Sequence, residues 1–268
     1  MKPTHSIVIP SYNRSRMVCR AINSVLGQTE TDFELLVVDD GSTEDYEAAL
    51  WAIRDPRVTK LRNATNLGVS QARNTGIEHA RGQYISFLDD DDEYLPTFLT
   101  DTSRRLRDAP PECAVTWCGI KSFEDDLGTE NPTASRSFLD EYPSRTVLFE
   151  QFLSIGSGFG VTAKADAIRK IGAFNTELRV VEDADLFLRF LTAGYMPAVV
   201  PGIHVVVHNH KHHRLTDKAM HPQRIEECEW LVERHSEFLV EFPSLQRQLL
   251  RRIEELTLEM SELEFKIA

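Results

Sequence analysis

Short apolar runs alternate with amphipathic stretches over the first part of the chain. The runs predict β-strands at 6–9, 33–38, 58–61 and 84–88. Between them, apolar residues at helical spacing predict helices at about 16–27, 43–53 and 69–80. Repeated strand–helix–strand units favour a parallel sheet with helices on both faces. Ligands of such sheets bind beyond the carboxyl ends of the strands, so the residues that follow each strand are the candidates for a site.

The pattern is less regular in the second half. Residues 109–145 are rich in Pro, Ser, Asp and Glu and predict a surface excursion after a strand at 114–117. The later elements are predicted as helices at 146–154 and 183–193, short strands near 196–200 and 203–207, and a helical tail over the last 45 residues. The pattern therefore divides the chain into a first half at 1–108, a second half at 109–215 and a helical extension at 216–268.

Composition narrows the class of protein. The chain has 268 residues, of which 41% are hydrophobic and 27% charged, values typical of a folded protein rather than a disordered one. Lys and Arg number 30 against 42 acidic residues, a net charge of −12. This balance argues against a nucleic-acid binder, which carries a basic surface. An acidic protein that binds a phosphorylated ligand needs a local cation, either a metal ion or placed arginines.

Cysteine and hydropathy patterns give the expected compartment. The four cysteines are too scattered for a disulfide framework and lack zinc-ligand spacing, which predicts free thiols in a reducing compartment. The apolar run at the N-terminus is too short for a signal peptide, and no window approaches the roughly 18 apolar residues of a membrane span. We therefore expect a cytoplasmic protein, with peripheral association at the inner face of the plasma membrane as a further expectation.

Polar or acidic residues follow three of the predicted strands, at 10–13, 39–42 and 89–93. Asp89 and Asp91 form an Asp-x-Asp pair at the end of the last of these strands. Carboxylate oxygens are the ligands that Mg²⁺ and Mn²⁺ prefer, with substrate phosphates and water completing the shell. The run predicts a divalent-cation site, and the alternative is a solvated acidic turn.

Four further features have a functional and a structural interpretation. Asp40 either accepts hydrogen bonds from a base or ribose, or belongs to a simple Asp-Asp-Gly-Ser turn. Arg73, on the helix after Asn66-Leu67-Gly68, either reaches the crevice or belongs to an ordinary helix start. Glu182-Asp183 either supplies a general base or only favours the dipole of the helix it begins. One of the clustered histidines, His210 among them, either completes a metal shell or lies on the surface.

Six motifs in order resemble a known family. They are Ile9-Pro10-Ser11-Tyr12-Asn13, Val37-Val38-Asp39-Asp40-Gly41-Ser42-Thr43, Asn66-Leu67-Gly68, Ala72-Arg73-Asn74, Phe87-Leu88-Asp89-Asp90-Asp91-Asp92, and Glu182-Asp183 with Leu186 and Arg189. Together they are similar to the family 2 glycosyltransferases, whose GT-A fold has a mixed, mainly parallel sheet flanked by helices. The resemblance covers about residues 4–215.

The resemblance implies inverting transfer of a sugar from a nucleoside diphosphate, usually UDP, to a hydroxyl of a glycan or glycolipid, as in bacterial surface-polysaccharide synthesis. Residues 1–215 would be the catalytic domain, with 1–108 binding the nucleotide and 109–215 the acceptor. By matching position, the nucleotide site would be formed by Pro10, Ser11, Tyr12, Asp40, Asn66, Gly68, Arg73 and Asp90. Asp91 would be the chief ligand of Mn²⁺ or Mg²⁺, with Asp89 and His210 supporting it. Asp183 would be the catalytic base, with Glu182 beside it.

The chain also departs from the family pattern and from rival classes. Arg14 stands where many relatives carry an acidic residue, and no Gln-x-x-Arg-Trp follows the base, which argues against the processive branch. A dinucleotide-binding oxidoreductase needs G-x-G-x-x-G after the first strand, where this chain has Pro10-Ser11-Tyr12-Asn13-Arg14. The remaining alternative is a catalytically silent GT-A module that binds a nucleotide sugar, which would not release UDP.

The tail carries an apolar seam that steps by four and three: Leu249, Ile253, Leu256, Met260, Leu263 and Ile267. Such a seam is typical either of a helix packed on its own domain or of a dimerising coiled coil. The sequence therefore leaves a homodimer through this helix, or a link to a further domain, as an alternative.

Overall fold

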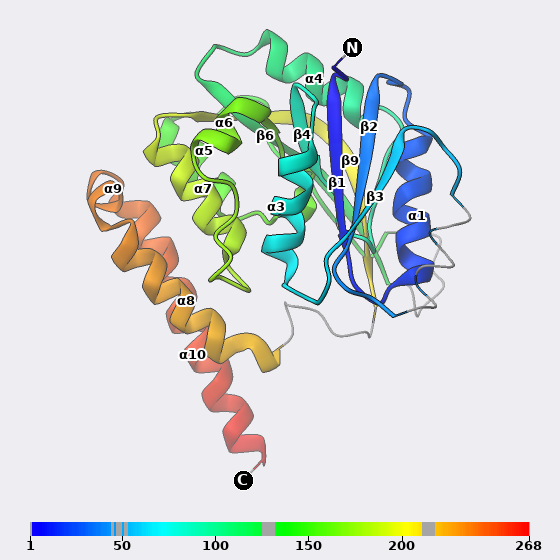
Figure 1. Cartoon of the computed structure of the whole chain (residues 1–268). Coiled ribbons are helices and arrows are strands. Elements are labelled where there is room, and N and C mark those ends of the chain that lie inside the picture. The colour runs from blue at the N-terminus through cyan, green and yellow to red at the C-terminus, as the bar shows by residue number, and fades with distance from the viewer. Residues whose placement is uncertain are drawn as a thin grey trace.

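The computed structural model describes residues 2–43, 46, 50, 53–124, 132–210 and 218–267. Within them, one mixed sheet of nine strands runs through the molecule, with helices on both faces (Figure 1). Its order is β3-β2-β1-β4-β8-β6-β9-β5, and β7 pairs with β6. The GT-A type of sheet predicted from the sequence is therefore confirmed.

The first half supplies the parallel part of the sheet. Its strands are β1 (His5–Ser11), β2 (Phe33–Asp39), β3 (Val58–Arg62) and β4 (Tyr84–Phe87). β1 pairs in parallel with both β2 and β4, and β2 with β3, so their carboxyl ends meet at one edge. β1 and β2 are buried along their whole length, as their apolar runs predict.

The second half continues the same sheet. Its strands are β5 (Glu93–Tyr94), β6 (Cys113–Glu124), β7 (Ala134–Arg136), β8 (Thr162–Lys164) and β9 (Met196–Asn209). β8 pairs antiparallel with β4 and β6 and so joins the two halves. β6 runs parallel to β9, whereas β5 and β7 pair antiparallel with β9 and β6. The parallel order of the first half therefore does not extend across the whole sheet.

Alternate residues of β1 belong to different hydrophobic clusters, as expected for a strand buried on both faces. Ile7 and Ile9 pack with α1 (Ser15–Leu26) and α4 (Phe98–Asp108). Val8 packs in the other cluster, with α3 (Val69–His79), α5 (Arg145–Leu153), α6 (Ala165–Lys170) and α7 (Glu182–Thr192). α3 lies close to β1 at Gly76, where an added Cβ would be 2.4 Å from the Val8 side chain.

Two sequence predictions of the second half were wrong in extent. β9 is one strand from Met196 to Asn209 and not two short ones, because the Pro201-Gly202 step is absorbed as an irregularity in its pairing with β6. β6 continues to Glu124 and pairs with β7, so strands occupy part of the expected surface excursion. Most of the helix predicted at 43–53, and part of that excursion, lie outside the described residues.

The tail is helical, as predicted, and consists of α8 (His221–Arg234), α9 (Ser236–Glu241) and α10 (Pro243–Ile267). In Figure 1, α8 and α10 lie side by side and extend from the body of the molecule. Leu245, Leu249 and Leu256 of α10 are buried against the chain's own helices, which favours the packed-helix interpretation of the seam. A homodimer stays a prediction. Among the described residues, no helix combines the length and apolar character that crossing a membrane requires.

Candidate active site

The acidic run after β4 lies at the carboxyl edge of the sheet. Asp89, Asp91 and Asp92 each place a carboxylate oxygen within 4.8 Å of the others. Asp91 and Asp92 are buried and Asp89 is half-buried, so their mutual repulsion is only weakly screened by water. Such a group of oxygens is the donor set of a hard divalent cation, and the residues therefore fit Mg²⁺ or Mn²⁺.

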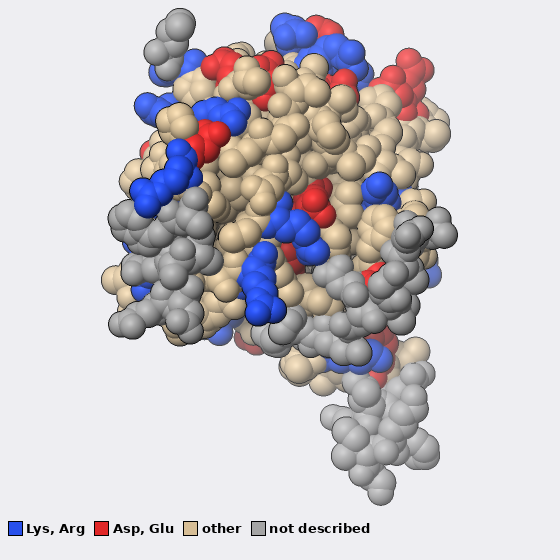
Figure 2. Space-filling view, turned by 90° about the vertical axis from the view of Figure 1, so that its right-hand side faces the viewer, with Lys and Arg blue, Asp and Glu red and all other residues tan. Residues whose placement is uncertain are grey.

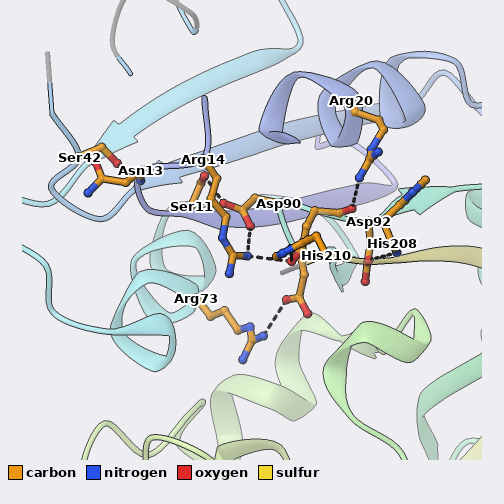
Figure 3. Close-up of polar contacts among 12 residues, drawn as sticks. Ser11, Asn13, Arg14, Arg20, Ser42, Arg73, Asp90, Asp92, His208 and His210 are labelled. Carbon is orange, nitrogen blue, oxygen red and sulfur yellow. Dashed lines mark hydrogen bonds and ion pairs between the residues drawn. The ribbon is translucent and has the colours of Figure 1, made fainter. Parts of the chain in front are cut away.

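Asp90 is held separately, at the end of β1 (Figure 3). It accepts hydrogen bonds from Ser11 Oγ and from Arg14 Nη1, the latter at 2.9 Å. Burial raises the pKa of the Asp90 carboxyl to about 6, although the Arg14 charge opposes this shift. Ser11 and Asp90, both predicted to belong to the nucleotide site, are thus in direct contact.

Asp91 is the best-connected carboxylate of the run. Its Oδ2 lies 2.8 Å from Arg14 Nη1 and 2.8 Å from His210 Nε2. Its backbone carbonyl accepts a hydrogen bond from Arg20 Nη2 at 2.7 Å. Asp91 and His210, expected to bind one metal ion, are therefore adjacent, and Arg14 supplies a positive charge at the same oxygen.

The other predicted nucleotide residues surround a loop after β3. Asp40 is buried and accepts from the Asn63 side chain at 2.7 Å and from the backbone N–H groups of Leu67 and Gly68 at 3.1 and 2.8 Å. These bonds occupy both oxygens, so Asp40 fixes the loop 63–68. The turn of the Asp-Asp-Gly-Ser motif itself is closed by Asp39, whose Oδ1 accepts the Ser42 N–H at 2.8 Å. Asn66 Oδ1 accepts a further hydrogen bond from Gly68 N–H.

The surface beside this loop contains exposed apolar groups. Pro10 is buried in β1, whereas the next-but-one residue, Tyr12, is 45% exposed. Leu67, whose N–H group is bound to Asp40, is 55% exposed. Large exposed apolar side chains next to a polar crevice are typical of a ligand-binding surface.

Arg73 of α3 reaches the crevice and joins its two sides. Its Nη2 lies 2.9 Å from Asp89 Oδ1 and its Nη1 lies 2.8 Å from Glu182 Oε1. Nη2 also donates to Ser157 Oγ at 2.7 Å. Burial alone would lower the pKa of this guanidinium, but the carboxylates of Asp89 and Glu182 raise it, so Arg73 stays charged.

Glu182 and Asp183 begin α7 on the far side of Arg73. Asp183 Oδ2 accepts the backbone N–H of Ser157 at 2.8 Å. Burial raises the pKa of both carboxyl groups, and Arg73 partly offsets the shift. A half-buried carboxylate with a raised pKa is suited to accept a proton.

Several residues of this crevice were not assigned from the sequence. Arg14 was noted only as a departure, and Asp92 only as part of the run; Ser157 was not singled out. Arg20 and His208 also contact the acidic segment, since the His208 N–H group donates to Asp92 Oδ1 at 3.1 Å. The acidic run itself is the signal for Asp92, whereas the others depend on contacts between distant segments.

Figure 2 shows one face of the molecule, on which basic and acidic side chains lie next to each other near the centre. On this face the described basic residues do not form one broad positive surface, in agreement with the net charge of −12. A polyanion such as nucleic acid has no extended basic surface to bind there.

Comparison with known proteins agrees with this fold and shows the family. Residues 6–172 match the family described as "Glycosyl transferase family 2". The chain therefore belongs to glycosyl transferase family 2 and is a glycosyltransferase.

Curated relatives support this family. The chain is 30% identical over 225 residues to "Putative colanic acid biosynthesis glycosyl transferase WcaA" of Escherichia coli strain K12, covering 80% of this chain and 76% of that protein. It is 31% identical over 214 residues to "Succinoglycan biosynthesis protein ExoO" of Rhizobium meliloti, covering 77% of this chain and 61% of that protein. Several curated relatives are thus longer, and the chain spans less than two thirds of their length.

Solved structures show the same fold. TarS 1-349 of S. aureus in complex with UDP-GlcNAc has a TM-score of 0.69 at 18% identity, over 90% of this chain and 72% of that chain. The mannosyltransferase PcManGT of Pyrobaculum calidifontis, in complex with GDP-Man and Mn²⁺, has a TM-score of 0.63 at 18% identity, over 98% and 76%. At this identity the likeness concerns the fold.

Proposed function

We propose that this glycosyltransferase moves a sugar from a nucleoside diphosphate sugar to a hydroxyl of a glycan or glycolipid, with inversion at the anomeric carbon. The observation that carries the proposal is the arrangement around Arg73. The acidic cluster with Asp89 lies on one side of its guanidinium, and the helix start with Asp183 lies on the other. The acidic cluster on one side of the crevice suits binding of the leaving group, and Asp183 on the other side suits acceptance of a proton.

The donor side would hold the nucleoside diphosphate. Ser11 and Tyr12 lie at the carboxyl end of β1, and the loop fixed by Asp40 follows β3, at the edge of the sheet where nucleotides bind to α/β folds. We favour UDP as the nucleotide: a structure of similar fold binds UDP-GlcNAc, whereas another binds GDP-Man. The named relatives act in colanic acid and succinoglycan biosynthesis, which supports a glycan acceptor in bacterial polysaccharide synthesis.

A divalent cation would bind at the acidic cluster. Asp91 would be its chief ligand, with Asp89 and Asp92 supplying further oxygens, and His210 lies against Asp91. Mn²⁺ or Mg²⁺ bound there would neutralise charge on the diphosphate as it leaves. Arg14 already places one positive charge at Asp91 and Asp90 in the chain itself.

The side of the crevice with Glu182, Asp183 and Ser157, here called the base side, would act on the acceptor. Asp183, ionised and held by Ser157 N–H, would take the proton of the acceptor hydroxyl as its oxygen attacks the anomeric carbon. The attack comes from the face opposite the departing diphosphate, so one displacement inverts the configuration. Glu182 would remain paired with Arg73, which keeps the guanidinium directed between Asp89 and the start of α7. The transfer passes through an oxocarbenium-like state, as in glycoside hydrolysis.

A donor screen tests this function. The purified chain is incubated with UDP- and GDP-sugars, with Mn²⁺ or with chelator, and released nucleotide is measured with and without glycan acceptors. We expect release from one nucleotide sugar, dependent on the metal and increased by acceptor, and an inverted anomeric configuration of the product by NMR. Binding of the donor with no release under any condition would instead identify a silent nucleotide-sugar-binding module.

The organisation of the chain adds three proposals. Residues 1–215 would form the catalytic domain, divided at residue 108 into donor and acceptor halves, and 216–268 an extension to it. The chain would act in the cytoplasm, at the inner face of the plasma membrane where a glycolipid acceptor is used, and cell fractionation tests this location. A homodimer through α10 would appear in light scattering as a doubled mass, which returns to the monomer value when residues 243–268 are removed.

A further inference from the structure

The helical extension contacts the segment that carries the candidate base. Glu227 of α8 is 6% exposed, and its carboxylate accepts three consecutive backbone N–H groups. These belong to Arg179, Val180 and Val181, at distances of 2.9–3.2 Å. Gln223, one turn earlier on α8, donates to Glu227 Oε1 at 2.9 Å. The carboxylate is thus surrounded by donors from the chain.

The three N–H groups lie immediately before α7, whose first residues are Glu182 and Asp183. The start of a helix presents unpaired N–H groups and a partial positive charge, so a buried carboxylate is stabilised there. Hydrogen bonds to an ionised acceptor are about twice as strong as neutral ones. Glu227 therefore fixes the backbone two to four residues before Asp183, although it acts from another helix.

A second contact holds α7 just beyond the base. His235, at the end of α8, places Nε2 3.0 Å from Asp185 Oδ1. Arg189 of α7 donates to the other oxygen of Asp185 at 2.7 Å, and Asp185 is 2% exposed. The extension thus contacts the chain on both sides of the Glu182-Asp183 pair. The family match ends at residue 172, before all of these residues.

We propose that Glu227 is a positioning residue for sugar transfer, which sets the orientation of Asp183 through the backbone at 179–181. The proposal rests on the proposed function, because it takes Asp183 as the base. Among the described residues, the Glu227 carboxylate bonds the backbone of residues 179–181 and the Gln223 side chain, and not the acidic cluster or Arg73, so it acts next to the candidate base only. Its loss would then affect turnover and leave nucleotide binding intact.

The test replaces the carboxylate by an amide of the same size. In Glu227→Gln, one acceptor oxygen becomes an NH₂ donor that faces backbone N–H groups, so part of the contact is lost. We expect kcat to fall on the order of tenfold to a hundredfold, as for a base displaced by a fraction of an ångström to about 1 Å. We also expect KM for the donor and the affinity for UDP to stay within about twofold, since donor residues are untouched.

Two controls make the result specific. Glu226→Gln changes the neighbouring, exposed carboxylate and should leave kcat unchanged. Should Glu227→Gln not fold, as judged by circular dichroism, Glu227→Asp decides, since it keeps the charge but shortens the side chain and should also lower kcat selectively. An unchanged kcat in a folded Glu227 variant, or a fall in UDP affinity that matches the fall in kcat, would overturn the proposal.

Hydrogen exchange separates this proposal from the proposed function. We expect Glu227→Gln to accelerate exchange at the amides of 179–183 at least severalfold and to leave those of β1 unchanged. Faster exchange in a chain whose wild type transfers no sugar would show that the contact fixes this backbone but that the proposed function is wrong. Unchanged exchange at 179–183 would overturn the positioning role, whatever the activity.

Discussion

Arg73 Nη1 lies 2.8 Å from Glu182 Oε1, although the two residues are 109 positions apart in the chain. Both side chains are buried, and the second terminal nitrogen of the same guanidinium lies 2.9 Å from Asp89 Oδ1. One arginine thus connects the acidic run after β4 with the start of α7. The acidic cluster and the start of α7 are held in a fixed relation by this pair of contacts.

Removing the Arg73 charge should destabilise the protein. Arg73→Met leaves Glu182 as a buried carboxylate without its cation, and such a change costs about 3–5 kcal/mol. Arg73→Lys keeps the charge but lacks the planar fork that meets Asp89, Glu182 and Ser157 together, so it should be intermediate.

Urea unfolding measures both variants against a surface ion pair. Arg104→Met removes the exposed partner of Asp101 on α4 and should cost less than about 1 kcal/mol. If Arg73→Met unfolded at the same urea concentration as Arg104→Met, the structural role assigned to Arg73 would be wrong.

Arg14 should compete with a divalent cation for Asp91. Its Nη1 lies 2.8 Å from the oxygen that also contacts His210, so Arg14→Ala leaves Asp91 and Asp90 without this cation. We expect the affinity for Mn²⁺ alone, measured by titration without donor, to rise severalfold, equivalent to about 1 kcal/mol for a partly exposed pair.

Two variants calibrate this measurement. Asp91→Ala removes the proposed chief ligand and should lower Mn²⁺ affinity below detection. Arg16→Ala changes an exposed arginine of the same segment and should have no effect. A weaker Mn²⁺ affinity in Arg14→Ala than in wild type would contradict the competition.

The pH dependence of kcat should reflect the ionisation of Glu182 and Asp183 at the start of α7. Burial raises the pKa of both Asp183 and Glu182, and a base must be ionised to accept a proton. Activity should therefore be lost as pH falls, with a midpoint above the value of about 4 that is usual for an aspartate.

Protonation of Asp90 could produce a similar loss of activity at acidic pH, because burial raises the pKa of Asp90 to about 6. Asp90→Asn removes the ionisable group at this position. If Glu182 and Asp183 cause the loss of activity at acidic pH, the remaining activity of Asp90→Asn should show the same loss. If the loss of activity at acidic pH disappeared in Asp90→Asn, or if its midpoint lay near pH 4 in the wild type, the assignment to Glu182 and Asp183 would be wrong.

The apolar seam of α10 should contribute stability within one chain. Leu256 is fully buried, so Leu256→Ala should cost about 2–5 kcal/mol in urea unfolding. Leu258, two residues on, is 63% exposed, and Leu258→Ala should stay within about 0.5 kcal/mol. Equal effects of the two substitutions would show that α10 is not packed as described.

The strands of the first half could be predicted because their signal is local. An uninterrupted apolar run such as 33–38 indicates a strand that is buried on both faces of the sheet, and turn residues mark the end of the strand. β8 was not predicted, because three residues are too few to show an alternation of apolar and polar positions. α4 was also missed, although Phe98, Leu99 and Leu106 lie on its buried face. Pro201-Gly202 wrongly indicated a break in β9, because a turn dipeptide in the sequence does not show whether a neighbouring strand tolerates a bulge.

The site followed the same rule. The acidic run and its position after a buried strand were visible in the sequence, whereas the sequence left open whether Arg73 reaches the crevice. Which carboxylates Arg73 contacts was not visible either, because Glu182 comes from a distant segment. Asp39 and Asp40 show both cases: the turn chemistry of their motif was visible in the sequence, and Asp39 closes that turn. The bonds from Asp40 to the loop 63–68 were not visible, because that loop follows another strand.

Titration of UDP and transfer kinetics on Asp183→Asn test the central claim most directly, since this substitution removes the proposed base and little volume. With the donor identified by the screen, the account predicts UDP affinity within about twofold of wild type and a fall in kcat on the order of a hundredfold to ten-thousandfold. Transfer at the wild-type rate by Asp183→Asn would contradict the account, because another group would then accept the proton.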